Sequence, residues 1–252
     1  MTEIQRDIVA EGRRVLDLAR SSGVPLRLLG GIAIRLRSPG PLAAPFERTY
    51  GDLDFVTAKG ASGKTQVFFR EIGYEPHKAF NALHGQERLL FFDNDNERQV
   101  DVFVGAFSMS HKIPVGDRLE VDDVTLPLAE LLLTKLQIAE LNEKDVKDAL
   151  ALVHGHDIGE SDGETVNAAR VAELCATDWG LWRTITANLS TCRDYVARYD
   201  VSDEEKERIR SRIDAVLARV EREPKSRGWK LRAKIGERKR WYELPEEVAG
   251  GP

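Results

Sequence analysis

Three aspartates in the first half of the chain have the side-chain type and spacing that could hold a divalent cation. Asp52 and Asp54 flank Leu53 in the segment DLDFVT, and Asp101 lies in the segment RQVDVFV. Because alternate residues of a strand point to the same face, Asp52 and Asp54 should project together. If the two segments form neighbouring strands, Asp101 can join the pair. Three such carboxylates suit Mg²⁺, which often also binds substrate phosphates and can help a hydroxyl attack phosphorus.

A strand that ends in two glycines precedes these acids. The segment LRLLGG at residues 26–31 predicts a short strand ending in Gly30 and Gly31. Glycines let backbone N–H groups approach a phosphate closely. The next residues, IAIRLR, predict a helix or loop, and SPGPLAAP at residues 38–45 predicts a loop. Alternation in DLDFVT predicts a strand, and ERLLFFDN followed by RQVDVFVG predicts a hairpin.

The remaining pattern places these strands among helices. Helices are predicted over residues 3–20 and in TQVFFREIGY, and RLEVDDVTLPL adds one short strand. From residue 128 to residue 156 the pattern is helical, and residues 165–222 predict two or three more helices. This order predicts an α+β fold. A small mixed β-sheet with flanking helices would occupy residues 1–125, and a helical C-terminal domain with a basic tail would occupy residues 126–252.

The composition is typical of a soluble globular protein. Of the 252 residues, 42% are hydrophobic and 31% are charged, and the formal net charge of −5 gives no general attraction to nucleic acid. The sequence has no run of 18 apolar residues and no apolar signal-peptide region, so we expect no contact with a membrane. Cys175 and Cys192 are the only cysteines, which favours a reducing, cytoplasmic location and two helix-packing side chains.

One segment runs against the overall negative charge. Residues 225–240, KSRGWKLRAKIGERKR, contain eight Lys or Arg and one Glu, with Trp229 inside the run and Trp241 just after it. Basic residues mixed with aromatic ones can follow a phosphate backbone and stack a base. The alternative, which a charge run more often indicates, is a solvated C-terminal helix or tail.

The stretches LLGGIAI and RTYGDLDF together resemble the opening signature of the nucleotidyltransferase (polymerase-beta-like) superfamily. That signature is an apolar strand, Gly-Gly or Gly-Ser, a short helix, and Asp-x-Asp on the next strand. Asp101 on a later strand also fits it. The gap from Gly31 to Asp52 is longer than the superfamily usually shows, and Gly31 stands where many members have serine.

Within that superfamily, the later stretch LLLTKLQIAELNEKDVKDALAL is similar to a helical motif of the AbiEii-type toxins. Its matching polar residues are Lys135, Lys144, Asp145 and Asp148, although the spacing from Lys135 to Asp148 is slightly short. The two stretches together cover roughly residues 26 to 155.

The resemblance implies a magnesium-dependent enzyme that moves a nucleoside monophosphate from a nucleoside triphosphate to an acceptor hydroxyl and releases pyrophosphate. It implies that Asp52, Asp54 and Asp101 bind Mg²⁺ and act in catalysis, Asp101 as the base or its orienting group. It also implies that Lys135 stabilises negative charge in the transition state. The nucleotide contacts that it implies come from Gly30, Gly31, Arg48, Lys135 and Asp148.

The acceptor and the alternatives to this activity stay open. The toxin-like motif favours an RNA acceptor such as a tRNA 3′ end, and hence a toxin with an antitoxin protein as partner. Enzymes that adenylylate aminoglycoside or lincosamide antibiotics share the first signature, so a small-molecule acceptor is the rival. A non-catalytic nucleotide-binding module is a third possibility.

Two further motifs suggest other sites. The segment AKGASGKT at residues 58–65 fits a loose P-loop pattern, so a P-loop NTPase using Lys64 and Thr65 is an alternative that we consider weaker. The segment HGHD at residues 154–157 predicts a surface loop and not a metal site, because histidines two apart do not share one face of a helix.

Overall fold

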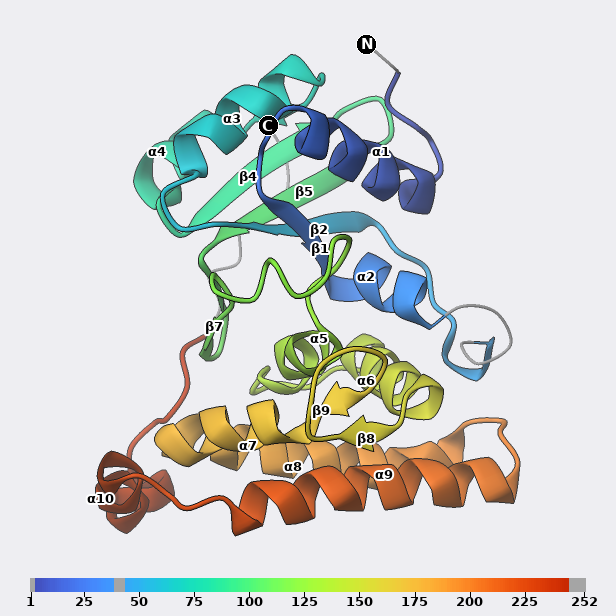
Figure 1. Ribbon diagram of the computed structural model, residues 1–252, viewed down its shortest axis with the longest axis vertical. Helices are drawn as coiled ribbons and strands as arrows, with labels where there is room; N and C mark the ends of the chain where they lie inside the picture. Colours follow the sequence, from blue (N-terminus) through green and yellow to red (C-terminus); the bar gives the residue numbers. More distant parts are fainter. Residues whose placement is uncertain (1–2, 39–43, 245–252) are drawn as a thin grey trace.

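The protein is described here by a computed structural model that covers residues 3–38 and 44–244. Four layers follow one another along its longest axis (Figure 1). Helices α1, α3 and α4 cover one face of a β-sheet, α2, α5 and α6 lie beyond the other face, and α7, α8 and α9 form the opposite end of the molecule. The predicted loop at residues 38–45 falls mainly on residues 39–43, which lie outside the described ranges.

The helices are α1 (Ile8–Ser21), α2 (Gly30–Arg37), α3 (Ser62–Glu71), α4 (Lys78–His84), α5 (Leu128–Leu136), α6 (Glu143–Gly155), α7 (Ala168–Thr177), α8 (Trp179–Tyr195), α9 (Asp203–Arg222) and α10 (Arg227–Ile235). The strands are β1 (Leu26–Leu29), β2 (Asp52–Thr57), β3 (Glu75–Pro76), β4 (Arg88–Asp93), β5 (Arg98–Val104), β6 (Ala106–Ser108), β7 (Lys112–Pro114), β8 (Ile158–Gly159) and β9 (Val166–Asn167). Short 3₁₀ turns are η2 (Ala44–Phe46), η3 (Val196–Arg198) and η4 (Gly236–Arg238).

The main sheet has five strands in the order β1-β2-β5-β4-β3. Strands β2 and β5 are parallel and the other pairs are antiparallel, so the sheet is mixed. The predicted strands β1 and β2 and the β4–β5 hairpin are all present. The α+β prediction is therefore confirmed.

The two faces of the sheet differ in character. On one face Leu53 contacts Gly12 of α1, and Phe55 packs edge-on against Phe69 of α3 with ring centroids 5.9 Å apart. Phe69 in turn stacks on Phe91 of β4 at 4.6 Å. Because one face is closed by apolar packing, the polar residues that alternate with these must lie on the other face.

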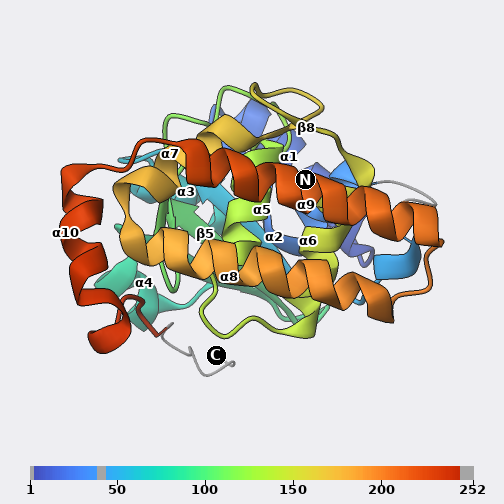
Figure 2. The same cartoon turned by 90° about the horizontal axis from the view of Figure 1, so that it is seen from below.

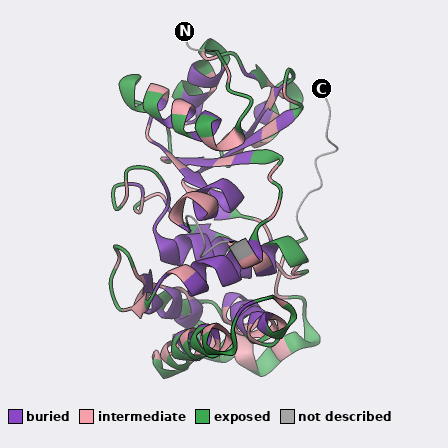
Figure 3. Ribbon diagram, turned by 90° about the vertical axis from the view of Figure 1, so that its right-hand side faces the viewer, coloured by how far each residue is buried: buried purple, intermediate pink, exposed green. Residues whose placement is uncertain are grey.

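One hydrophobic core joins the sheet to the helical half. Buried residues continue from the strands through α5 and α6 into α7, α8 and α9 (Figure 3). Cys175 and Cys192 lie inside this core, as predicted for helix-packing residues. The domain boundary between residues 125 and 126 stays a prediction. Within the described ranges, no helix combines the length and apolar character needed to cross a bilayer.

The structure corrects the prediction for several elements. Residues 118–128 form no strand and contribute only an isolated bridge between Thr125 and Leu28. The helical pattern of residues 128–156 divides into α5 and α6. Helix α4 and the β6–β7 hairpin were not predicted, because their segments are too short to show a period.

The division between α5 and α6 has a local cause. The Asn188 side chain donates 2.7 Å hydrogen bonds to the carbonyl oxygens of Leu136 and Ile138, which satisfies the open end of α5. Asn142 then caps α6 by accepting a hydrogen bond from the Asp145 backbone N–H. The turn between them places the last residues of α5 beside the first turns of α6.

Candidate active site

The sheet brings the three predicted aspartates to one face of two adjacent strands. Asp54 of β2 pairs in register with Asp101 of β5, and Asp52 pairs with Gln99. Paired residues of neighbouring strands share a face, so these four side chains lie together on the face opposite α1 and α3. The shared face of Asp52 and Asp54 is the one that their two-residue spacing predicts, and the pairing of β2 with β5 adds Asp101 to it.

Gly30 and Gly31 make room for the side chains around Asp54. Gly30 has a φ of +68°, and a Cβ atom there would lie 2.0 Å from the Asp54 Oδ2 atom. A Cβ atom on Gly31 would lie 2.2 Å from Arg48 Nη2 and 2.8 Å from the Tyr50 ring. The glycine pair is thus required by close packing at the start of α2, whether or not its N–H groups also meet a phosphate.

Gly30→Ala should therefore destabilise the protein by about 2–4 kcal/mol, because a left-handed backbone and a clash with Asp54 act together. Gly60→Ala is the matched control, since Gly60 has a φ of +87° and no atom within 4 Å of the added Cβ. It should cost only the backbone part, about 1–2 kcal/mol. Urea unfolding measures both changes, and equal losses would contradict the close approach of Asp54 to Gly30.

A buried ion cluster faces the aspartates from the helical side. Arg48 forms a two-point ion pair with Asp148, with Nε–Oδ1 at 2.9 Å and Nη2–Oδ2 at 2.8 Å. The Lys135 Nζ atom lies 2.9 Å from the second oxygen of Asp148 and 3.5 Å from Asp145 Oδ1. Asp148 is 2% exposed, so both of its oxygens are engaged inside the protein. It holds the two cations in place and does not itself line the cleft.

A cleft of about 430 Å³ lies between the acids and this cluster. The predicted site residues that line it are Arg48, Asp52, Asp54 and Lys135, and the others are Thr49, Gly51, Gln99, Asn142, Lys144 and Asp145. Gln99 was missed although it precedes Asp101 by two residues, which is the same strand signal that identified the aspartate pair. Asn142 was missed because helix capping alone explains an asparagine at that position.

The acids on the sheet side of the cleft disfavour one another's charge. Burial, together with the nearby carboxylates of Asp52 and Asp101, raises the pKa of Asp54 well above its ordinary range. The cations Lys135 and Arg88 offset this only in part. Within the part of the chain that the structure describes, the side-chain oxygens of Asp52 and Asp54 accept no hydrogen bond. A cation bound beside Asp54 would therefore favour the ionised form of its carboxyl group.

The cluster on the helical side has the opposite character. Burial alone would raise the pKa of Asp148, but hydrogen bonds from Arg48 and the charge of Lys135 outweigh it and lower that pKa. Burial alone would lower the pKa of Lys135, but Asp148, Asp145 and Asp54 outweigh it and raise that pKa. Lys135 therefore stays a cation that points between the two groups of acids.

Asp101 lies between the cleft and a second cavity. Its Oδ2 atom accepts a 2.8 Å hydrogen bond from Gln99, which lines the cleft. Its Oδ1 atom accepts a 2.7 Å hydrogen bond from Arg88, which lines a cavity of about 240 Å³ on the other side. That cavity is bordered by Phe80, His84, Glu87, Arg88, Phe103, Ser108, Met109, Glu243 and Leu244. Arg88 was missed, because a single arginine at the start of a strand gives no sequence signal.

The aspartates suit Mg²⁺ as a pair more readily than as a trio. In the described ranges no three His, Cys, Asp or Glu side chains, as they stand, are arranged to hold a metal ion. To bind the ion, Asp101 would have to give up the hydrogen bond from Gln99 or the one from Arg88. Asp52 and Asp54 need no such exchange, and Mg²⁺ is commonly held by one or two carboxylates, with substrate phosphates and water completing its shell. The donor set therefore fits the predicted ion.

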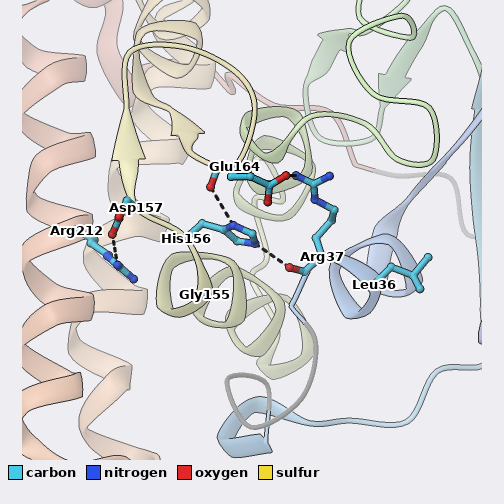
Figure 4. Close-up of a pocket in the computed structure, with 7 residues that line it drawn as sticks. All are labelled: Leu36, Arg37, Gly155, His156, Asp157, Glu164 and Arg212. Carbon is cyan, nitrogen blue, oxygen red and sulfur yellow. Dashed lines mark hydrogen bonds and ion pairs between the residues drawn. The ribbon is translucent and has the colours of Figure 1, made fainter.

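A cavity of about 470 Å³ elsewhere in the protein has different chemistry (Figure 4). The His156 side chain lines this cavity. Its Nε2 atom lies 2.9 Å from the Arg37 carbonyl oxygen, and its Nδ1 atom lies 3.1 Å from the Glu164 carbonyl oxygen. Arg37 also pairs with Glu164, and Arg212 pairs with Asp157. These contacts connect the end of α2, the β8–β9 segment and α9. Because the residues that line this cavity pair with one another, we interpret the cavity as part of the structural connection between these three elements.

The structure also places the two remaining motifs. Lys64 Nζ donates to the Gly23 carbonyl oxygen at 2.8 Å, and Thr65 is buried beside Thr57, so neither side chain is placed as in a P-loop. The mixed sheet also argues against that alternative, which requires a parallel one. The prediction that residues 154–157 form a surface loop is wrong, because His154 and His156 are buried where α6 ends.

Comparisons with known proteins give little beyond the geometry. No family model and no curated protein matches the sequence. Among solved structures, the chain is similar to an antigenic nucleotidyltransferase-like protein from Paracoccidioides brasiliensis, with a TM-score of 0.42 and 11% sequence identity. The match covers 90% of this chain and 97% of the other. A likeness at this level assigns no family.

Proposed function

We propose that the protein transfers a nucleoside monophosphate from a nucleoside triphosphate to an acceptor hydroxyl. The observation that carries the proposal is the pairing of Asp54 with Asp101 across β2 and β5, opposite the Lys135 ammonium group. Acids that repel one another on one wall and a buried cation on the other suit a triphosphate accompanied by a divalent ion.

Each wall of the cleft would do a different part of this work. Lys135, held by Asp148 and Asp145, would place a fixed positive charge where the transferred phosphoryl group becomes more negative. Asp52 and Asp54 would hold Mg²⁺, joined by Asp101 once Gln99 or Arg88 releases it. The ion, when bound, supplies charge neutralisation and alignment of the phosphates.

Asp101 would meet the acceptor on the side away from the triphosphate. The 240 Å³ cavity opens beside Arg88, which holds one of the two Asp101 oxygens. An acceptor hydroxyl in this cavity would approach Asp101, which would accept or orient its proton. We favour an RNA end as acceptor, in line with the toxin-like motif. A toxin role with an antitoxin partner remains a prediction from the resemblance.

A cationic small molecule is a second candidate acceptor. The observation that favours it is the presence of Glu87 and Glu243 on the rim of the same cavity. Two carboxylates there would attract an amine-bearing ligand such as an aminoglycoside and would repel a phosphate backbone.

Incubation of the purified protein with each α-³²P-labelled nucleoside triphosphate, Mg²⁺ and total tRNA tests the proposal, with a parallel reaction on aminoglycosides. We expect label in the RNA and none in the drug. Label in the drug would instead support the second candidate. Unchanged triphosphate in every reaction, from protein whose fold is intact by circular dichroism, would overturn the proposed activity.

Lys135→Met should lower the transfer rate at least about 100-fold while the protein stays folded, because Arg48 still neutralises Asp148. Lys64→Met is the matched control and should leave the rate within about twofold, since Lys64 only reaches the Gly23 carbonyl oxygen. Initial rates of label transfer measure both. A loss confined to Lys64→Met would restore the P-loop alternative.

A further inference from the structure

We propose that the exposed basic side of α10 and of the residues after it binds the phosphate backbone of a nucleic acid. This α10 basic surface consists of Arg227, Lys230, Lys234, Arg238, Lys239 and Arg240. All six side chains are exposed, and in the described ranges none of them forms an ion pair with an acid. The proposal goes beyond the transferase activity and does not depend on it.

The absence of acidic partners distinguishes this surface from the neighbouring helices. On α9, Arg212 pairs with Asp157 and Arg219 pairs with both Glu160 and Glu223. On α8, Arg193 pairs with Asp214. Arg183 pairs with Glu237, which is the single acid of residues 225–240. A chain with a net charge of −5 thus presents, within the described ranges, six exposed cations without acidic partners on α10 and the residues just after it. Unpaired, exposed cations keep their full attraction for a polyanion.

A cluster of tryptophans fixes the position of this surface. Trp229 of α10 packs edge-on against Trp182 of α8, with ring centroids 5.1 Å apart, and Trp241 lies 6.0 Å from Trp179. The Arg232 guanidinium lies 4.7 Å from the centre of the Trp179 ring. These contacts hold α10 across the end of the helical layer (Figure 2).

Arg232 also shapes the turn that follows α10. Its guanidinium donates 2.7 Å hydrogen bonds to the carbonyl oxygens of Gly236 and Lys239. This bracing holds the backbone of residues 236–239, so the basic residues of the turn remain beside those of the helix. A surface ordered before binding loses less conformational entropy when it meets a ligand.

The same contacts determine what the surface can recognise. The sequence raised the possibility that Trp229 and Trp241 stack on bases, but both rings pack against α8. The exposed polar groups of this surface are cations, and cations bind phosphates whatever the base sequence. We therefore expect binding that depends strongly on salt and only weakly on base sequence.

The structure favours a nucleic acid over an anionic membrane as the occupant. A helix that lies in a membrane interface presents a continuous apolar face with aromatic anchors. On α10 the tryptophan faces inward, and the exposed apolar side chains are limited to Leu231 and Ile235 among the described residues. Cations flank this pair in both chain directions, which suits an extended polyanion.

Charge reversal on the surface tests the proposal. The variant Lys230→Glu/Lys234→Glu/Lys239→Glu removes three surface cations. Its control, Arg13→Glu/Arg70→Glu/Lys78→Glu, makes the same change of net charge on α1, α3 and α4 at the other end of the molecule (Figure 1). Fluorescence anisotropy with a labelled 20-nucleotide RNA, without Mg²⁺ or nucleotide, measures Kd from 50 to 300 mM KCl.

We expect the α10 variant to bind RNA at least 10-fold more weakly than the native protein, and the control to stay within about threefold. The slope of log K against log salt should fall by about 2, because each phosphate contact on a single strand contributes roughly 0.7. Poly-U, poly-A and single-stranded DNA should bind with similar Kd. Unfolding midpoints of all proteins should match within a few degrees.

Other outcomes would overturn the proposal. Equal weakening of RNA binding in both variants would mean that net charge alone governs binding. An absence of RNA binding by the native protein at 50 mM KCl would show that the surface does not bind nucleic acid. Tighter binding to phosphatidylserine vesicles than to RNA or DNA would show that the surface serves a membrane. Because nucleotide and Mg²⁺ are absent, none of these results depends on whether the protein is a transferase.

The path of the chain links this surface to the proposed acceptor cavity. The Glu243 backbone N–H donates to the Ser110 carbonyl oxygen at 3.0 Å, and Glu243 and Leu244 border the cavity beside Asp101. If the proposed function holds and RNA is the acceptor, the α10 variant should raise KM for RNA and leave kcat unchanged. A fall in kcat at an unchanged KM would contradict the assignment of this surface to binding of the RNA acceptor.

Discussion

Asp54→Asn should abolish nucleoside monophosphate transfer and, at the same time, make the protein more stable. The loss of activity should exceed about 1000-fold, because the substitution removes a charge that the proposed Mg²⁺ site requires. The gain in stability follows from the raised pKa of Asp54, which burial and the neighbouring acids Asp52 and Asp101 cause. A neutral amide of the same shape escapes the cost of ionising there.

The sign of the stability change fixes its pH dependence. Since the folded pKa of Asp54 lies above that of the unfolded chain, the folded protein binds the proton more tightly, and Asp54 costs stability as pH rises between the two values. The native protein and Asp54→Asn should therefore be equally stable well below pH 4 and differ most at neutral pH. We therefore expect Asp54→Asn to be more stable than the native protein at neutral pH, and the gain to disappear in acid.

Thermal unfolding in EDTA, from pH 3 to pH 8, measures this effect. A chain of this length shifts its Tm by about 2–4 °C for each kcal/mol. Asp95→Asn is the control, because Asp95 is exposed in the turn between β4 and β5 and should leave Tm unchanged. Millimolar Mg²⁺ should raise the Tm of the native protein and not that of Asp54→Asn. An inactive variant that is also less stable would show that Asp54 has a structural role.

How far the sequence predicts the site depends on the range over which its patterns act. The spacing of Asp52 and Asp54 predicts a shared strand face, since two-residue alternation is set by the backbone alone. That Asp101 comes beside Asp54 depends on strand pairing, which a pattern within one strand does not determine. The resemblance supplied that step, and the register of β2 and β5 agrees with it.

Other parts of the site could not be predicted because they depend on contacts between distant segments. Arg88 approaches Asp101 through hairpin register, and Asn188 ends α5 from a helix about 50 residues away. The glycine pair was predicted for one reason and also has another. Gly30 and Gly31 were expected to admit a phosphate, and the structure shows that they make room for Asp54 and Arg48. Residue type indicated the close approach but not the partner.

Asp148→Ala should be the most destabilising substitution in the site, with a loss of about 3–5 kcal/mol. Arg48 and Lys135 are largely buried, with side chains 11% and 14% exposed, and both donate to the Asp148 carboxylate. Removing one member of a buried ion cluster leaves the others without compensation, and this costs more than the cluster contributed as a whole. Asp145→Ala is the control and should cost less, because Lys135 lies 3.5 Å from Asp145 and retains Asp148.

Two further measurements separate this explanation from simple loss of packing. Adding Lys135→Met to Asp148→Ala should recover part of the lost stability, because one uncompensated charge is removed together with its partner.

The pKa of Asp148 is lowered, so its contribution to stability is present above the ordinary aspartate pKa of about 3.9 and is lost as pH falls below it. The deficit of Asp148→Ala relative to the native protein should therefore shrink in acid. The Asp54→Asn difference also shrinks in acid but has the opposite sign, because that variant is the more stable one at neutral pH. Additive losses in the double variant, or a difference that is independent of pH, would mean that Asp148 only fills space. The opposite pH dependences of Asp54 and Asp148 have one explanation only if the sheet wall of the cleft lacks positive charge and the helical wall holds Arg48 and Lys135 in place. That explanation would then fail.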